Sequence, residues 1–482
     1  MPFVWYIIKS YNNALHIKFL ENKVEDIKIA YIGGGSRGWA WGFMSDLVSA
    51  SDISGEVRLY DINHKLAQNN VVIGNKYNTA KGAKSKWKYK AVKSLSEALN
   101  GANFVIISIL PGTLDEMQSD VHTPEKYGIY QAVGDSTGPG GIVRALRALP
   151  IFENIALAIK EHCPDAWVIN YTNPMTTITR MLYKVFPKIK AFGCCHEVFG
   201  VQKLLSAVLE ENGIKGVPRE EIKVNVIGVN HFTWLTKAQY KNINIFPMYE
   251  KFVEKYLEKG YTKGRDENWV KTINTTSHQV KMDLFHRYGY IAAAGDRHLA
   301  EFCDGNWYLK NPETVDKWGF ALTPISFRRE VIEDREYSYN KMISGEEEIV
   351  IRNTGEDGVN QIRALLGLHT FVTNVNIPNI GQIPNLPMGV VVETNAVFSS
   401  NSIVPVMAGE IPNAIYPLIS RIVFEQETVV ESAIMRDVSI AFKAFVNSPL
   451  VTIGLDDAKA LYKEMLENTK NYLTDYKGFD KI

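Results

Sequence analysis

A glycine-rich segment near the start of the chain limits the possible folds more than any other feature. An apolar run at residues 27–32 is typical of a buried strand, and the pattern G-x-G-x-x-G follows it at Gly33, Gly35 and Gly38. Gly33 permits a tight turn, Gly35 lets the backbone approach a pyrophosphate, and Gly38 allows a helix to pack closely on a sheet. We expect the helix that follows to bind phosphate groups at its N-terminus, with Ser36 inside the binding loop.

An acidic residue follows the next strand-like run. Asp61 ends the sequence V-R-L-Y-D. A carboxylate at this point accepts hydrogen bonds from ribose hydroxyls and repels a 2′-phosphate, which favours NAD over NADP. The strand, the loop, the helix and the acidic residue together predict a cofactor site. The alternative is a glycine-rich turn of an α/β protein that binds another nucleotide or nothing.

Short β-branched runs alternate with helix-length segments through the first part of the chain. Strand-like runs lie at residues 27–33, 55–62, 102–110, 166–172 and 190–195. A long helical pattern spans residues 142–162. Because strands that alternate with helices form parallel sheets covered on both faces, we expect an α/β fold with a Rossmann-type, doubly wound sheet.

The pattern changes after about Gly200. Residues 223–240 are typical of a strand hairpin, and long helical patterns follow. We therefore expect a mixed α+β domain after the Rossmann-type domain. The predicted divisions are an extension at 1–26, an NAD-binding domain at 27–200, and a domain at 201–482 that carries substrate and metal contacts and the oligomer interface.

The composition argues against several classes of binding partner. The formal net charge is zero, which removes the electrostatic argument for nucleic acid or an anionic membrane. Four cysteines are too few for a disulfide scaffold, so a reducing compartment and a cytoplasmic location are expected. The apolar run at residues 2–8 is too short to span a bilayer and lacks the features of a signal peptide.

Two neighbouring cysteines and a distant histidine could bind a metal. Side chains of adjacent strand residues point to opposite faces, so either Cys194 or Cys195 should face the core and the other a cleft. His231 ends another apolar run. A thiolate and an imidazole would leave a divalent ion with open positions, as in catalytic metal sites. Buried packing residues are the alternative explanation.

The order and spacing of several motifs resemble a known family. They are IGGGSRGW, LYD, SDVHTPEKYG, GDSTGPGGIVRALRALP, NYTNPM, CCHEV, GVNHF and AGDRHLAEF. Through them the chain, from about Ile27 to its C-terminal region, resembles glycoside hydrolase family 4, the NAD- and divalent-metal-dependent glycosidases. The resemblance implies a small sugar substrate and a homodimer or homotetramer.

The resemblance also implies roles for single residues. Cys195 and His231 match the ligands of the metal, usually manganese. Asn173 matches a residue that binds substrate and cofactor near the metal. Asp120 falls where the family has its general acid, and Asp296 where it has a general base.

The residues after the metal cysteine are similar to one branch of the family. The run Cys195-His196-Glu197 is similar to the branch that acts on unphosphorylated α-glycosides, including α-glucosidases and α-galacturonidases. His196 and Glu197 could contact a sugar hydroxyl or cap a helix. Arg297 and His298 could bind a substrate carboxylate, which would favour a uronic acid.

One segment departs from the phospho-sugar members of the family. Where these members have Gln-Glu-Thr, this chain has Gly134, Asp135 and Ser136. The wall of the sugar pocket is therefore expected to differ from that of the phospho-sugar members.

The implied mechanism removes hydride from C3 of the sugar with NAD, removes a proton from C2, eliminates the aglycone and adds water. The net reaction is hydrolysis of an α-galacturonide or an α-glucoside. The alternative is an NAD-dependent dehydrogenase of a sugar or 2-hydroxy acid, similar to lactate and malate dehydrogenases, which share the cofactor fold. A sugar-sensing protein without activity would require a defective site.

Overall fold

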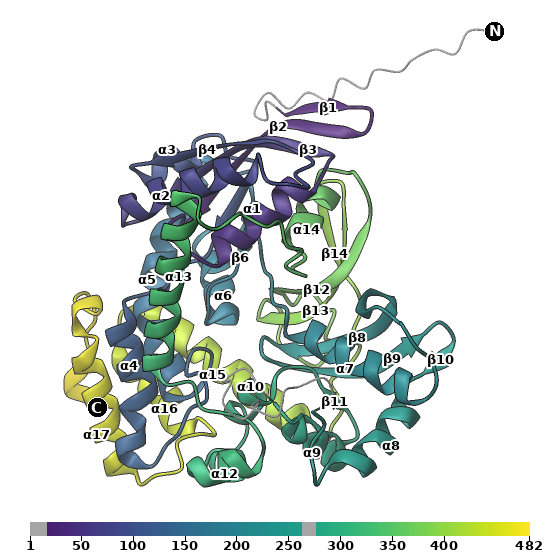
Figure 1. Cartoon of the computed structure of the whole chain (residues 1–482). Helices are drawn as coiled ribbons and strands as arrows, with labels where there is room; N and C mark the ends of the chain where they lie inside the picture. The colour runs from purple at the N-terminus through teal and green to yellow at the C-terminus, as the bar shows by residue number, and fades with distance from the viewer. Residues whose placement is uncertain (1–16, 263–275) are drawn as a thin grey trace.

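A ten-stranded sheet runs through the protein in a computed structural model that describes residues 17–262 and 276–482 (Figure 1). Its strands are β1 (Lys18–Leu20), β2 (Lys23–Ile32), β3 (Ile53–Tyr60), β4 (Trp87–Val92), β5 (Phe104–Ile107), β6 (Trp167–Asn170), β7 (Lys190–Gly193), β12 (Phe371–Pro378), β13 (Val391–Ser399) and β14 (Ser402–Pro405). Strands β2 to β7 are parallel and lie in the order β7-β6-β5-β2-β3-β4. This is the Rossmann order, with its switch point between β2 and β5, so the predicted fold class is confirmed.

Three antiparallel strands from the second half of the chain extend the same sheet. Strand β12 pairs with β7, β13 pairs with β12, and β14 pairs with β13. These strands belong to the segment that we expected to form a second domain. The sheet therefore continues across the predicted division at residue 200.

Helices cover both faces of this sheet. Along β2, Ile29 and Tyr31 face one apolar core, and Ala30 and Ile32 face the other. The helices of the first core are α1 (Trp39–Ser49), α2 (His64–Tyr77) and α14 (Gly358–Leu365). Those of the second include α3 (Leu95–Leu99), α5 (Gly138–His162), α6 (Met175–Val185), α15 (Tyr416–Met435), α16 (Val438–Asn447) and α17 (Leu455–Asn468). Burial on both faces explains why these strands are apolar without alternation.

A second, four-stranded sheet follows the Rossmann-type unit. It contains β8 (Ile222–Val229), β9 (Phe232–Tyr240), β10 (Ile243–Asn244) and β11 (Ile291–Ala292). Strands β8 and β9 form the predicted hairpin, closed by Asn230 and His231. The other helices are α4 (Leu114–His122), α7 (Glu197–Glu211), α8 (Phe246–Tyr256), α9 (Gln279–Tyr288), α10 (Asp296–Glu301), α11 (Gly305–Tyr308), α12 (Pro312–Lys317) and α13 (Ile325–Ser344). The mixed α+β composition expected after the first domain is thus observed.

The end of the predicted extension is a strand hairpin. Strand β1 pairs with the start of β2 in antiparallel register, and all three residues of β1 are exposed. Residues 1–16 of the extension lie outside the described part of the chain. Among the described helices, none is both long enough and apolar enough to cross a membrane.

A buried carboxyl group links helix α15 to the start of α5. The Thr137 hydroxyl donates to Glu425 Oε1 at 2.7 Å, and burial raises the pKa of Glu425 from 4.5 to about 7. As the pH rises from 4.5 to 7, the unfolded chain therefore releases this proton before the folded chain does. The unfolding free energy should fall over that range, by up to about 3 kcal/mol from this group.

Replacing Glu425 with glutamine should reduce this pH dependence. Glutamine keeps an oxygen that can accept from Thr137 but cannot ionise, so E425Q should be more stable than the wild type at pH 8. Urea unfolding at pH 5 and pH 8 measures the difference. The matched control is E431Q on the exposed side of the same helix. Equal pH dependence in E425Q and the wild type would contradict the assignment.

Candidate active site

The glycine-rich loop lies between β2 and α1, as the sequence predicts. Gly33 has φ +91°, and a Cβ at this position would lie 2.0 Å from the carbonyl oxygen of Ser108. The backbone N–H groups of Gly33 and Gly34 donate to the carbonyl of Tyr60 at 2.9 and 2.8 Å. Only glycine fits at residue 33, because both the backbone conformation and the space exclude a side chain.

Asp61 holds the glycine-rich loop in place. Its Oδ2 accepts from the N–H of Gly35 at 2.9 Å, and its Oδ1 accepts from the N–H of Asn63 at 2.8 Å. Each carboxylate oxygen can accept a second hydrogen bond, so the group remains able to bind ribose hydroxyls. Helix α13 covers the other end of the loop, where a Cβ at Gly38 would lie 2.7 Å from Arg335 Nη1.

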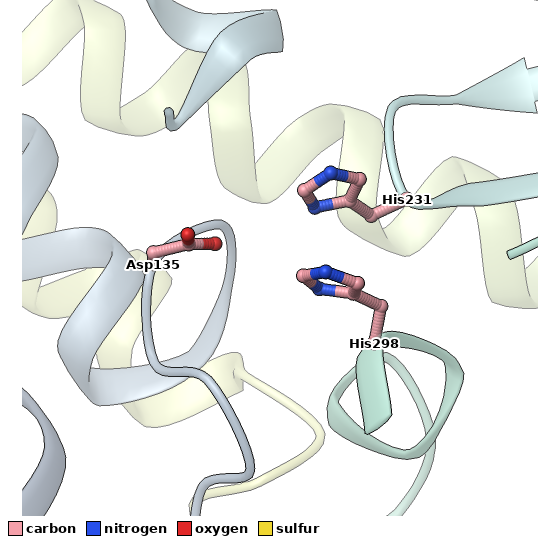
Figure 2. A group of neighbouring side chains, drawn as sticks. All are labelled: Asp135, His231 and His298. Carbon is pink, nitrogen blue, oxygen red and sulfur yellow. The ribbon is translucent and has the colours of Figure 1, made fainter. Parts of the chain in front are cut away.

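Three buried side chains form a candidate group of metal ligands, called the metal-ligand set below. Ligand atoms of Asp135, His231 and His298 all lie within 4.8 Å of one another. Figure 2 shows the carboxylate of Asp135 facing the two imidazoles, and the histidine ring centroids are 3.8 Å apart. The three residues come from the loop before α5, the β8–β9 turn and helix α10. Long-range contacts in the fold therefore assemble the set.

The protonation states of the set suit a divalent cation. Burial lowers the pKa of His231 to about 3, with repulsion from His298 as a further cause. Burial also lowers the pKa of His298. Burial alone would raise the pKa of Asp135, but His298, His231 and Arg144 outweigh it and keep this pKa below its ordinary value. Two neutral imidazoles and an ionised carboxylate are donors that Mn²⁺, Fe²⁺ and Zn²⁺ accept.

Unpaired buried polar atoms around the set also point to a ligand. Among the described residues, His298 Nδ1, Asn173 Oδ1 and Asn230 Oδ1 have no hydrogen-bond partner. Leaving such atoms buried and unpaired costs about 1–3 kcal/mol each. Asn173 Nδ2 donates to Asp135 Oδ2 at 3.2 Å, and the Ser136 hydroxyl lies 2.9 Å from His231 Nδ1. The residues present therefore fit a bound cation with a polar substrate beside it.

The two neighbouring cysteines have different surroundings. Cys194 belongs to the apolar core that contains α1 and α14. Cys195 is buried close to Glu197, and burial raises the pKa of its thiol well above the usual value, with Glu393 and Glu197 as further causes. Cys195 is not part of the set formed by Asp135, His231 and His298. Its role as a metal ligand stays a prediction.

The two aspartates expected to transfer protons are held in buried ion pairs. Asp120 is 1% exposed and receives two hydrogen bonds from Arg147, one of them at 2.9 Å from Nη1 to Oδ1. Asp296 is fully buried and lies 2.8 Å from Lys281 Nζ. Both carboxylates thus have structural partners, and their roles as acid and base stay predictions.

Several of the expected substrate residues, though not His196, lie around the metal-ligand set. Glu197 Oε1 is 3.7 Å from His298 Nε2, and burial alone would raise the pKa of Glu197, but three histidines hold it at about 2. His196 Nδ1 instead pairs with Glu356 Oε1 at 2.8 Å. Arg297 has Glu197 and Asp135 among its charged neighbours. Glu197 and Arg297 are therefore near His298, whereas His196 turns toward Glu356.

The structure adds residues to which the sequence gave no role. Asp135 and Ser136 lie in the segment that departs from the phospho-sugar members, inside a motif that carries the family resemblance. Arg144 lies in the same motif and donates from Nε to the Asn173 carbonyl at 3.1 Å. His298 was expected as a substrate residue and is observed beside His231.

A cavity of about 330 Å³ lies beside the glycine-rich loop. Gly38, Trp39, Tyr171, Arg335 and Glu356 line part of it. Tyr171 follows β6, and Glu356 pairs with His196, the residue after Cys195. The cavity therefore lies between the loop and the ends of strands β6 and β7.

Comparisons with known proteins agree with this geometry. The model of the family 4 glycosyl hydrolases matches residues 28–211, and the model of their C-terminal domain matches residues 226–451. The chain is 59% identical to an α-galacturonidase of Thermoanaerobacterium saccharolyticum, over 96% of this chain and 99% of the relative. Three further relatives at 50–52% identity have the same name.

Solved structures show the same fold. The Bacillus subtilis protein lplD is 51% identical, with a TM-score of 0.87 over 92% of this chain and 100% of its own. A 6-phospho-β-glucosidase of Thermotoga maritima, solved with manganese, NAD⁺ and glucose-6-phosphate, is 23% identical, with a TM-score of 0.72 over 92% of this chain and 99% of its own. The two family models together cover most of the sequence. The chain belongs to family 4 of the glycosyl hydrolases.

Proposed function

We propose that the protein is an α-galacturonidase that uses NAD and a divalent cation. The observation that carries the proposal is that Asp135 of the buried metal-ligand set lies 3.2 Å from Asn173, just beyond the carboxyl end of β6, at the edge of the sheet where the glycine-rich loop follows β2. Ligands of doubly wound α/β proteins bind at this edge, beyond the carboxyl ends of the strands. The identity of 59% to a relative named α-galacturonidase supports the substrate class.

The dinucleotide would be held by the glycine-rich loop. The pyrophosphate would lie against the backbone of Gly35, Ser36 and Gly38 at the start of α1, where the helix dipole favours negative charge. Asp61 would accept hydrogen bonds from a ribose. Arg335, which lies against Gly38, would place a further positive charge beside the phosphates.

The cation would be held by Asp135, His231 and His298, with Cys195 as the further ligand that the family resemblance implies. NAD supplies reversible oxidation of a sugar carbon, and the cation supplies Lewis acidity. Asn173 would orient the sugar, because its Oδ1 is buried without a partner among the described residues. Asp120 is proposed as the acid and Asp296 as the base. Assembly into a homodimer or homotetramer stays a prediction.

Hydrolysis of chromogenic glycosides tests this function. We expect the purified protein with NAD⁺, Mn²⁺ and a thiol reductant to cleave p-nitrophenyl α-D-galacturonide faster than the α-galactoside or the α-glucoside. Activity should disappear without NAD⁺ or in a chelator, and NADH should not accumulate. NADH formation in proportion to substrate would identify a dehydrogenase instead.

A further inference from the structure

Three arginines, Arg144, Arg297 and Arg328, lie near one another beside the metal-ligand set. Burial and repulsion from Arg147 and Arg328 lower the pKa of Arg144 to about 10, so it remains a cation at neutral pH. Its Nη1 is buried and has no hydrogen-bond partner among the described residues. Arg297 also has Arg328 among its charged neighbours. Arg328 therefore lies close enough to both to repel them.

Arg328 has no anionic partner within the described part of the chain. It lies in the first turn of α13, and its Nε is buried without a hydrogen bond. The next residue, Arg329, points elsewhere and pairs with Asp115 at 2.6 Å. A buried guanidinium nitrogen without a partner is costly, because it loses its hydration and gains nothing in return. The Nε–H group of Arg328 therefore lacks a hydrogen-bond acceptor among the described residues.

The start of α13 is fixed against the loop that carries Asp135. The N–H of Thr323 donates to the carbonyl of Ala132 at 3.0 Å, and the N–H of Ile325 donates to His122 Nε2 at 3.2 Å. Ala132 lies three residues before Asp135 in the sequence. Together with the proximity of Arg328 to Arg144 and Arg297, these contacts put the first turn of α13 beside the candidate active site.

The balance of charges in this region favours an anionic substrate. Arg144 and Arg297 lie near the carboxylates of Asp135 and Glu197, Arg328 lies near these two arginines, and a bound divalent cation would add further positive charge. A neutral hexose would leave Arg328 unpaired. A uronic acid differs from its hexose by a carboxylate at C6, and the planar fork of arginine binds a carboxylate with two parallel hydrogen bonds.

We propose that Arg328 binds the C6 carboxylate of the galacturonic acid unit and sets the preference for uronides over neutral glycosides. The inference rests on the proposed function, since it takes the sugar to bind beside the metal-ligand set. Arg297 and His298 were the candidates for carboxylate binding in the sequence, and Arg328 lies in none of the motifs that carry the family resemblance.

Arg328→Met and Arg328→Lys test the proposal against both substrate classes. On p-nitrophenyl α-D-galacturonide, kcat/KM of R328M should fall about 10- to 100-fold, mainly through KM, because a charge-assisted pair is lost. On p-nitrophenyl α-D-galactoside, kcat/KM of R328M should differ from that of the wild type by less than about twofold. R328K should recover only part of the loss, because an ammonium lacks the fork. The matched control is Arg329→Met, which removes an exposed arginine.

Titration calorimetry with free galacturonate and with NAD⁺ distinguishes a loss of carboxylate binding from general damage to the site. R328M should bind galacturonate more weakly and NAD⁺ with unchanged affinity. An equal loss on both glycosides, or a weaker affinity for NAD⁺, would overturn the role of Arg328. Unchanged galacturonide kinetics in R328M would overturn it too, with the proposed function intact. If the wild type neither binds nor cleaves a galacturonide, the proposed function fails and this inference fails with it.

Discussion

Replacing His231 with asparagine should lower the glycosidase activity at least about 100-fold and leave the fold intact. Replacing a residue that hydrogen-bonds to a metal ligand already lowers metal affinity or activity about 10- to 100-fold. Replacing a ligand itself should therefore lower them further. His231 has φ +64°, in the left-handed region that asparagine also adopts. Asparagine therefore preserves the β8–β9 turn and removes only the imidazole.

Binding of Mn²⁺ is the direct measurement. Titration calorimetry on chelator-treated protein should show tight binding by the wild type and weak binding by H231N. The control is His286→Asn, the same substitution at an exposed position of α9. It should retain both Mn²⁺ affinity and activity. If H231N bound Mn²⁺ as tightly as the wild type, His231 would not be a ligand.

The parallel part of the fold follows from local sequence patterns. The strand, loop and helix around Gly33 to Gly38 were predictable, because glycine spacing and apolar runs act over short distances. The extension of the sheet by β12, β13 and β14 was not predictable in this way. Strand β12 joins β7 by pairing Asn376 with Gly193, which is far away in the sequence, and no local pattern encodes that partner.

The residues of the candidate site were likewise predictable only where a local sequence pattern marks them. His231 was found because it ends a strand-like run and matches a family motif. Asp135 and His298 are brought to it from distant loops and helices, and a sequence does not show which polar residues become neighbours. Arg328 left even less signal, since its importance lies in lacking a partner. That property exists only in the folded protein.

Arg147→Met should destabilise the protein by about 3–5 kcal/mol. Arg147 and Asp120 are each 1% exposed, so removing the guanidinium leaves a carboxylate buried without its counter-ion. The substitution also removes the bond from Arg147 Nε to the Pro111 carbonyl, which is 3.0 Å long. Urea unfolding at neutral pH should show a lower midpoint, compared with R329M as the control.

The double variant Asp120→Asn/Arg147→Met separates structure from catalysis at this pair. Removing both charges together leaves no unpaired ion, so most of the lost stability should return. If Asp120 is the general acid, the activity of the double variant should remain about 10²- to 10⁴-fold below that of the wild type, because the asparagine amide cannot donate a proton as an acid. If activity returned together with stability, Asp120 would be a structural residue whose task is to fix Arg147, and the acid would be another group at the site.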